Sequence, residues 1–209
     1  MNAIKLIFKE TEDDLFGQSK WWGAPDLPED WEYPQMLDEE GDSIPLLFLC
    51  QINCADLAKY DKDNLVPHEG MLSFFAAITE YLDDYEYGFD CPYANQYGEW
   101  DPRTFKVLYS PKTDNLEPVD VLWDDETIHL TEEAITFSSK GDSDFYLLGE
   151  TDDPEVAEQH PEYINLLQVG EEDRWSLRFV DCGILNFLIK PEDLKNRNFD
   201  KVIANLVYC

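Results

Sequence analysis

Two glutamines have the placement in this chain that most suggests a function. Gln51 interrupts the apolar run Phe-Leu-Cys-Gln-Ile-Asn at residues 48–53, and Gln168 interrupts a similar run, Asn-Leu-Leu-Gln-Val-Gly, at residues 165–170. A buried amide needs hydrogen-bond partners, and leaving one unpaired costs about 1–3 kcal/mol. Two interpretations follow. Both side chains could line a shared cleft and bind the polar edge of a ligand, or each could fix the irregular backbone of its own segment.

Other residue types that often do chemistry lack the necessary spacing. Cys50 and Cys54 are separated by three residues, with His68 downstream, which is not the spacing of a zinc knuckle. The acidic clusters lack the alternating oxygen ligands of a calcium loop. The chain has no nucleophile elbow, no P-loop and no dinucleotide-binding glycine pattern, although a Cys–His pair assembled in space stays open. We therefore predict no metal, no cofactor and no catalytic residue, and whether the chain is an enzyme stays uncertain, with the sequence favouring that it is not.

A tyrosine-rich acidic segment, residues 81–101, is the best candidate for a binding surface. It contains five tyrosines and six acidic residues. Tyrosine and tryptophan provide a large contact area at protein interfaces with few rotatable bonds, and the acidic residues would attract a basic partner. The alternative is a solvated loop whose rings fold back onto the core. The candidate binding residues are Tyr85, Tyr87, Tyr93, Tyr97 and Trp100 of this segment, together with Trp22, Gln51 and Gln168.

Composition excludes some classes of partner. Among 209 residues, 46 acids outnumber 15 bases, for a formal net charge of −31. Such a surface repels phosphate, so we predict no nucleic-acid and no membrane partner, whereas a basic protein would be attracted. An acid-rich proteome would also explain the charge. We find no signal segment and no apolar run of the roughly 18 residues that a membrane span needs, so we expect a cytoplasmic protein with free thiols. The sequence does not determine the oligomeric state.

Short strands must position these residues. Residues 3–9 alternate apolar and polar side chains, the runs 45–53, 71–78, 163–169 and 183–189 are apolar, and 175–180 alternates like another strand. Each glutamine-bearing strand is followed by a loop, a glycine and a second apolar strand, so the same unit occurs twice. We predict an α+β fold of mainly antiparallel sheet with a few short helices and internal duplication of a strand–short helix–strand unit. It forms a single domain of two related halves, about residues 1–110 and 111–209.

Several motifs together resemble a known family. They are Trp-Gly-x-Pro-x-x-Pro at residues 22–28, Pro-Leu-x-Phe-Leu-x-Gln-Ile at 45–52, Pro-x-x-Gly-x-Leu-x-Phe-Phe at 67–75 and Gly-Ile-Leu-x-Phe-x-Ile-x-Pro-Glu-Asp-Leu at 183–194. In this order they resemble the YwqG-like family (DUF1963) of bacterial proteins of unknown function. The resemblance implies a compact cytoplasmic protein with a duplicated α+β fold, and it implies no reaction, cofactor or catalytic residue. Relatives often look like neighbours of secreted-toxin systems, which suggests an immunity-type role.

Two functional hypotheses follow. The preferred one is an uncharacterised cytoplasmic binding protein that engages a protein partner, expected to be basic, through an acidic aromatic surface, as an inhibitor or immunity-type protein. The alternative is a small-molecule binding or hydrolytic module with a cleft between the two repeats, walled by Gln51, Gln168 and Trp22.

Overall fold

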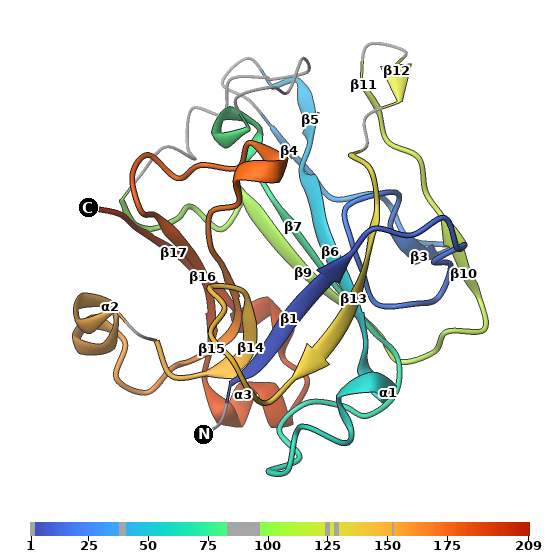
Figure 1. Cartoon of the computed structure of the whole chain (residues 1–209). Coiled ribbons are helices and arrows are strands. Elements are labelled where there is room, and N and C mark those ends of the chain that lie inside the picture. Colours follow the sequence, from blue (N-terminus) through green and yellow to red (C-terminus); the bar gives the residue numbers. More distant parts are fainter. Residues whose placement is uncertain (1–2, 38–40, 83–96, 124–125, 128–129, 152) are drawn as a thin grey trace.

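The fold is dominated by one antiparallel sheet. The computed structural model describes residues 3–37, 41–82, 97–123, 126–127, 130–151 and 153–209 (Figure 1). Strands make up 40% of the structure and helices 13%, and eleven strands form a single sheet that curls into a half-barrel. The predicted α+β class is therefore wrong, because the chain is mainly β.

The strands of this sheet have a simple spatial order. From edge to edge they are β8 (Gly98–Glu99), β17 (Ile203–Val207), β16 (Ile184–Ile189), β15 (Ile164–Val169), β14 (Tyr146–Gly149), β1 (Ile4–Lys9), β13 (Glu133–Ser138), β2 (Lys20–Trp21), β6 (Leu47–Asn53), β7 (Met71–Ala76) and β9 (Phe105–Ser110). Three two-stranded ribbons lie outside it: β3 (Asp26–Pro28) with β10 (Leu116–Pro118), β4 (Gln35–Leu37) with β5 (Ser43–Pro45), and β11 (Leu122–Trp123) with β12 (Glu126–Thr127).

The helices are too short to form a layer. They are α1 (Cys54–Leu57), α2 (Pro154–Gln159) and α3 (Pro191–Lys195), with the 3₁₀ turns η1 (Thr79–Tyr81), η2 (Asp173–Trp175) and η3 (Phe199–Lys201). Asp153 caps α2 as its position before a proline predicts, but α2 buries only Val156 and α3 only Leu194. A helix with a single buried residue has no apolar stripe to pack on a sheet, so these helices only close connections.

Two arms of the sheet have matching pairing patterns around the two glutamines. In one arm β6, with Gln51, lies between β2 and β7, and in the other β15, with Gln168, lies between β14 and β16. Gln51 pairs with Lys20 of β2, and Gln168 pairs with Tyr146 of β14. Both glutamine strands also contain a register shift two residues before the glutamine. Lys20 and Tyr146 therefore occupy corresponding places.

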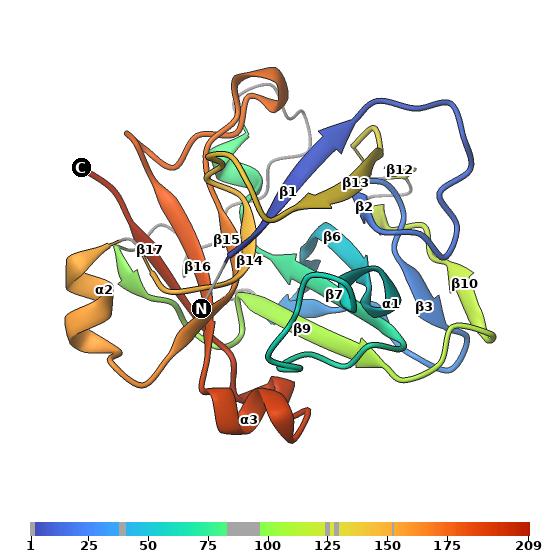
Figure 2. The ribbon, with the colours of Figure 1, turned by 60° about the horizontal axis from the view of Figure 1, so that its bottom comes forward.

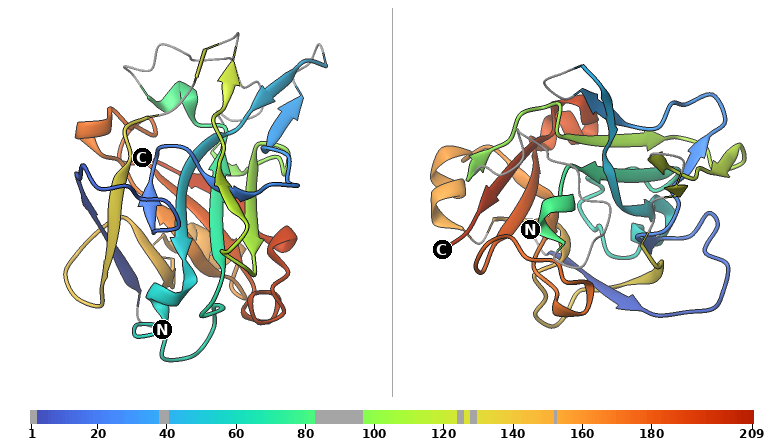
Figure 3. Two further views of the ribbon diagram at one scale, coloured as in Figure 1. Left: turned by 90° about the vertical axis from the view of Figure 1, so that its right-hand side faces the viewer. Right: turned by 90° about the horizontal axis from the view of Figure 1, so that it is seen from above.

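The strands β1 and β13 connect the two arms, because each pairs with the strand that follows the other in sequence. β1 precedes β2 in sequence but pairs with β14, whereas β13 precedes β14 but pairs with β2. The pairing of β1 with β13 begins with Lys5 opposite Ser138 and ends with Lys9 opposite Ala134. The strand order is the same outward from this pair in both directions, with β14, β15 and β16 on one side and β2, β6 and β7 on the other (Figures 2 and 3). The organisation as one domain of two related halves stays a prediction, and this register is compatible with it.

One core is shared by both arms. A single cluster of buried apolar side chains extends from β6 and β7 to β15, β16 and β17. The ring of Phe74 on β7 meets that of Phe187 on β16, with centroids 5.6 Å apart. In Figure 3 the two arms, teal-green and orange-red, face each other across this core when viewed from above. The arms therefore form one body with side chains from both at their junction.

Candidate functional site

Gln51 and Gln168 do not share a cleft. Gln51 is completely buried, and its amide accepts from the backbone N–H of Asp26 and donates to the carbonyl of Gln18, at 2.9 Å each. Gln168 is also buried and donates to the carbonyl of Asp144 at 3.1 Å. Each amide thus holds the chain two residues before the neighbouring strand, β2 or β14. Among the described residues, both side chains support the backbone of their own arm.

A buried ion pair completes the support around Gln51. The Asp26 carboxylate accepts from the backbone of Gly17 at 2.8 Å and lies 3.3 Å from Lys20 Nζ, with both charged side chains at most 3% exposed. Lys20 also lies 3.5 Å from Glu132. Buried charges are tolerated when they are paired and hydrogen-bonded. This network therefore fixes the irregular segment before β3 and has no open face for a ligand.

The tyrosine-rich segment is described only at its ends. Three candidate residues lie outside the described part of the chain: Tyr85, Tyr87 and Tyr93. Tyr97 is 44% exposed, and a hydrogen bond to the Glu155 carboxylate raises its pKa to about 12. Its ring meets that of Tyr208 at 5.2 Å. Trp100 is buried and stacks on Tyr81. Of these two described candidates, only Tyr97 presents its ring to solvent.

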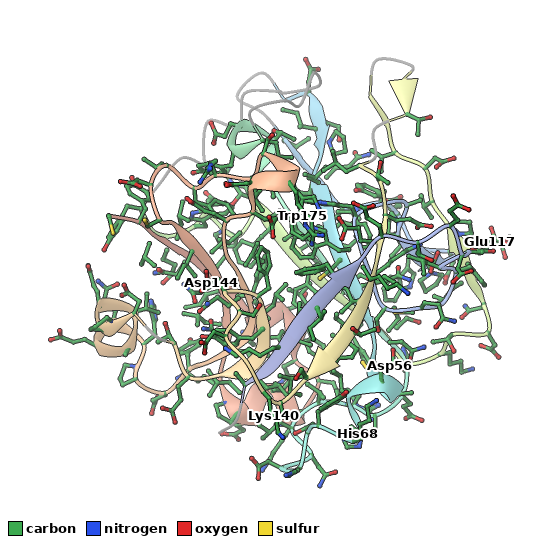
Figure 4. The ribbon with its side chains drawn as sticks, in the orientation of Figure 1. Asp56, His68, Glu117, Lys140, Asp144 and Trp175 are labelled. Carbon is green, nitrogen blue, oxygen red and sulfur yellow. The ribbon has the colours of Figure 1, made fainter. Side chains whose placement is uncertain are left out.

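Trp22 lies on the wall of a pocket of about 390 Å³ at the junction of the arms. The other lining residues come from the end of β1, the start of β13 and the loop after β15: Glu10, Leu130, Thr131, Glu133, Arg174, Trp175 and Ser176. We call this the aromatic–carboxylate pocket. Figure 4 labels Trp175, which lies beside the upper part of β1. Of the candidate residues expected in a cleft between the repeats, the pocket includes Trp22 but neither glutamine.

Aromatic rings form one side of the aromatic–carboxylate pocket. Trp175 stacks on Trp21, with centroids 5.2 Å apart and planes at 21°, and meets Phe8 edge-on at 4.8 Å. Its ring lies 6.1 Å from that of Trp22. The Arg174 guanidinium lies 4.5 Å from the centre of the Trp175 ring, within the range of a cation–π interaction. The stacked rings hold Trp175 in place and leave one indole face to a cation.

A buried carboxylate forms the other side. Glu133 is 5% exposed, and its Oε1 accepts from Trp175 Nε1 at 2.6 Å. Its Oε2 lies 3.1 Å from an Arg174 nitrogen, and the Arg174 side chain, 38% exposed, also lies 3.6 Å from Glu172. The pocket therefore joins a fixed carboxylate to an indole face, which is the arrangement that binds a guanidinium or ammonium group.

The strand pairing relates this pocket to a second one, of about 300 Å³, in the other arm. The corresponding residues are Glu10, Trp22 and Glu133 in the first pocket and Ser139, Leu148 and Ile4 in the second. Both Trp22 and Leu148 have positive φ, 58° and 56°. The second pocket also includes Asp61, which contacts His68, and Figure 4 shows His68 and Trp175 toward opposite ends of β1. The backbone framework is thus repeated, while the chemistry of the side chains differs.

The residue that corresponds to Glu133 in the other arm shows whether the fold requires a carboxylate at this position. Ile4, at the corresponding position of β1, is 1% exposed, so the framework accepts an apolar side chain there. Burying a carboxylate instead costs desolvation free energy. Since the fold does not require a charge at this place, Glu133 stands out among the described residues as a buried charge that the fold itself does not explain.

Cysteines and acidic clusters contribute no centre in the described part of the chain. There, no group of three His, Cys, Asp or Glu side chains is arranged to hold a metal ion. Cys50 and Cys54 are free and buried, and burial raises the pKa of both thiols, that of Cys54 to about 12. In the described part of the chain, no helix has the combination of length and apolar character that crossing a membrane requires.

Sequence reasoning missed Glu133, Arg174 and Trp175. A signal for Glu133 was present, because in residues 133–138 it alternates in phase with Ile135 and so faces the interior. Trp175 was expected to begin a strand at 175–180. It instead ends η2, where Ser176 adopts φ 50° and turns the chain. The alternation of apolar and polar residues does not predict such a turn.

Comparison with known proteins identifies a family without a known role. The family model described as a domain of unknown function (DUF1963) matches residues 19–155 and 141–207. No curated protein matches the chain.

Proposed function

We propose that the chain, which belongs to the DUF1963 family of unknown function, acts in the cytoplasm as a non-enzymatic binding protein for a basic protein partner. A lysine or arginine side chain of the partner would enter the aromatic–carboxylate pocket. The observation that carries the proposal is Glu133, a buried carboxylate at a place where Ile4 satisfies the fold in the other arm. The expected inhibitor or immunity-type role is compatible with this chemistry.

Arg174 indicates which group the pocket accepts. Its guanidinium lies over the Trp175 ring at 4.5 Å and 3.1 Å from Glu133, as an arginine from a partner would. Because the Arg174 side chain is 38% exposed and also reaches Glu172, it can move toward Glu172 when a partner cation takes its place beside Glu133. In this proposal Arg174 occupies the pocket until a partner side chain replaces it.

The charge of the chain supports a basic partner. With a net charge of −31, long-range attraction raises the association rate of cations and falls with added salt. The lining of the pocket includes Glu10 and Glu133 with Arg174, so displacement of Arg174 leaves two acidic residues and no basic residue in the lining. Attraction brings the partner to the surface, and the pocket gives one side chain a defined place.

The test is a titration followed by tryptophan fluorescence and calorimetry. The probe is a capped hexapeptide of alternating arginine and glycine, compared with one in which glutamate replaces arginine. We expect the arginine peptide alone to bind, more weakly at higher salt. Glu133→Gln, which can still accept from Trp175, should weaken binding at least tenfold. Glu132→Gln is the matched control, because Glu132 pairs with Lys20 outside the pocket lining, and it should leave pocket binding within about twofold.

The variant Arg174→Ala distinguishes an Arg174 that the ligand displaces from an Arg174 that itself contacts the ligand. Removing the internal occupant should strengthen binding of the arginine peptide severalfold. Weaker binding after Arg174→Ala would show that Arg174 itself contacts the ligand, and the proposal would be wrong. Absence of peptide binding to the unaltered protein at low salt would also contradict it.

A second candidate function uses the same pocket. Its volume of about 390 Å³ is in the range of small-molecule sites, roughly 300–1,000 Å³. A small organic cation such as agmatine could therefore be the ligand in place of a protein side chain. Agmatine binding as tightly as the arginine peptide would favour this candidate, whereas tighter peptide binding favours a protein partner.

A further inference from the structure

Two exposed cysteines lie next to each other although they are far apart in sequence. Cys182 belongs to the turn before β16, and Cys209 follows β17. Both are free and exposed, and the backbone N–H of Cys209 donates to the carbonyl of Asp181 at 3.1 Å. In a trans peptide that oxygen is about 3 Å from the next Cα, so the two cysteine Cα atoms are at most about 7 Å apart. A disulfide spans about 4.4–6.8 Å between Cα atoms.

We propose that Cys182 and Cys209 are a thiol–disulfide site that reacts with low-molecular-weight disulfides of the glutathione type. One cysteine thiolate attacks a sulfur of oxidised glutathione, forms a mixed disulfide and releases one glutathione thiolate. The other cysteine thiolate attacks the protein sulfur of that mixed disulfide and releases the second glutathione. The cysteine pair loses two electrons, and the two protons of its thiols end on two molecules of reduced glutathione.

The pKa shift of Cys182 agrees with the closeness of the two thiols and also predicts that their reaction is slow. The Asp181 carboxylate, which accepts a hydrogen bond from the Cys182 thiol, raises the pKa of Cys182, and Cys209 contributes to the same shift. The two sulfurs therefore interact electrostatically. Buried Cys50 and Cys54 have no access to a glutathione molecule, and Cys91 lies outside the described residues.

Closing the disulfide would fix two segments of the surface. Glu171 accepts from the backbone N–H groups of Phe179 and Gly183, at 2.8 and 2.9 Å, and so holds the turn that contains Cys182. The residue before Cys209 is Tyr208, whose ring meets that of Tyr97. A Cys182–Cys209 bond would tie Tyr208 to this held turn. Oxidation would thereby link the exposed contact between Tyr208 and Tyr97 to this turn.

The experiment incubates the full chain with oxidised glutathione and maps disulfides by mass spectrometry of non-reduced tryptic peptides. We expect the peptides of Cys182 and Cys209 to be joined within one molecule, and reduced glutathione to separate them. The apparent melting temperature of the oxidised form should rise by about 5–10 °C, because the closed loop restricts the unfolded chain. Asp181→Asn should speed closure severalfold, because it removes the charge that disfavours the Cys182 thiolate.

The variants Cys182→Ser and Cys209→Ser are matched controls. Each keeps one thiol of the pair and should form only a mixed disulfide with glutathione. Glutathione adducts on both cysteines without a joined peptide, a bond from either cysteine to Cys91, or joining only between molecules would each overturn the proposal. These outcomes are independent of the aromatic–carboxylate pocket. The two proposals therefore fail separately.

Discussion

Replacing Glu133 by isoleucine tests whether this carboxylate serves binding or folding. The variant places in the aromatic–carboxylate pocket the residue type that Ile4 supplies at the corresponding position of the other arm. We expect the fold to persist and binding of the arginine peptide to be strongly weakened. The physical reason is that the surroundings of Ile4 show an apolar side chain to be compatible with this framework, whereas a cation in the pocket needs the charge.

The expected change in the free energy of unfolding is small because opposing contributions nearly cancel. Loss of the hydrogen bond to half-buried Trp175 costs about 1 kcal/mol. Loss of the ion pair with Arg174, whose side chain is 38% exposed, costs roughly 0–1 kcal/mol. Burying isoleucine gains about 1.5–3 kcal/mol. The net change should stay within about 2 kcal/mol, which is a shift in melting temperature of at most about 8 °C.

Urea unfolding and the peptide titration together decide the outcome. A charge-assisted hydrogen bond is worth about 1.5–3 kcal/mol, so the dissociation constant of the arginine peptide should rise by roughly 10- to 100-fold. Glu132→Ile is the control for charge, because Glu132 is 35% exposed and lies outside the pocket lining. A loss of more than about 4 kcal/mol in stability, the range of broken buried networks, would show that Glu133 is structural. Unchanged peptide binding would refute its role in recognition.

Three further predictions concern other described residues. Gln51→Leu should lower the free energy of unfolding by about 2–5 kcal/mol in urea titrations, because two backbone partners and the Asp26 carboxylate lose their hydrogen bonds. Tyr97 should ionise near its raised pKa of about 12, and Glu155→Gln should move this ionisation to lower pH in phenolate absorbance. Burial raises the pKa of Cys54 from 9.0 to about 12, so the folded state keeps a proton that the unfolded state has lost. The free energy of unfolding should therefore fall as pH rises from 9.0 toward 12, and Cys54→Ala should reduce that fall.

Each of these predictions has a matched control. Gln168→Leu should cost less than Gln51→Leu, because the partners of the Gln168 amide among the described residues are an Asn165 amide and a backbone carbonyl; an equal cost would contradict the role given to Asp26. Tyr208→Phe should leave the high pKa of Tyr97 nearly unchanged, since the Glu155 hydrogen bond is its largest cause. Cys182→Ala, at an exposed thiol, should not reproduce the alkaline effect of Cys54→Ala.

Local patterns in the sequence were sufficient to locate five strands of the sheet, namely β1, β6, β7, β15 and β16. Continuous apolar runs around Gln51 and Gln168 predicted β6 and β15, because a strand covered on both faces needs no polar side. The start of α2 was also visible in Asp153 and the proline after it. The fold class was nevertheless wrong. Capping residues indicate where a helix begins. The length of the helix depends on how many apolar residues it can bury, and α2 buries one.

The site required information that no local pattern contains. No residue near Ile4 or Glu133 in the sequence indicates that β1 pairs with β14 and β13 with β2. This choice of partner strand depends on packing across the whole sheet. The pocket joins Trp22, Glu133 and Trp175 from segments separated by some 150 residues of chain. Residue types and strand periodicity were determined by the sequence itself, because they act over a few residues. Which carboxylate meets which indole was decided only by the tertiary structure, because register between distant strands depends on the common core.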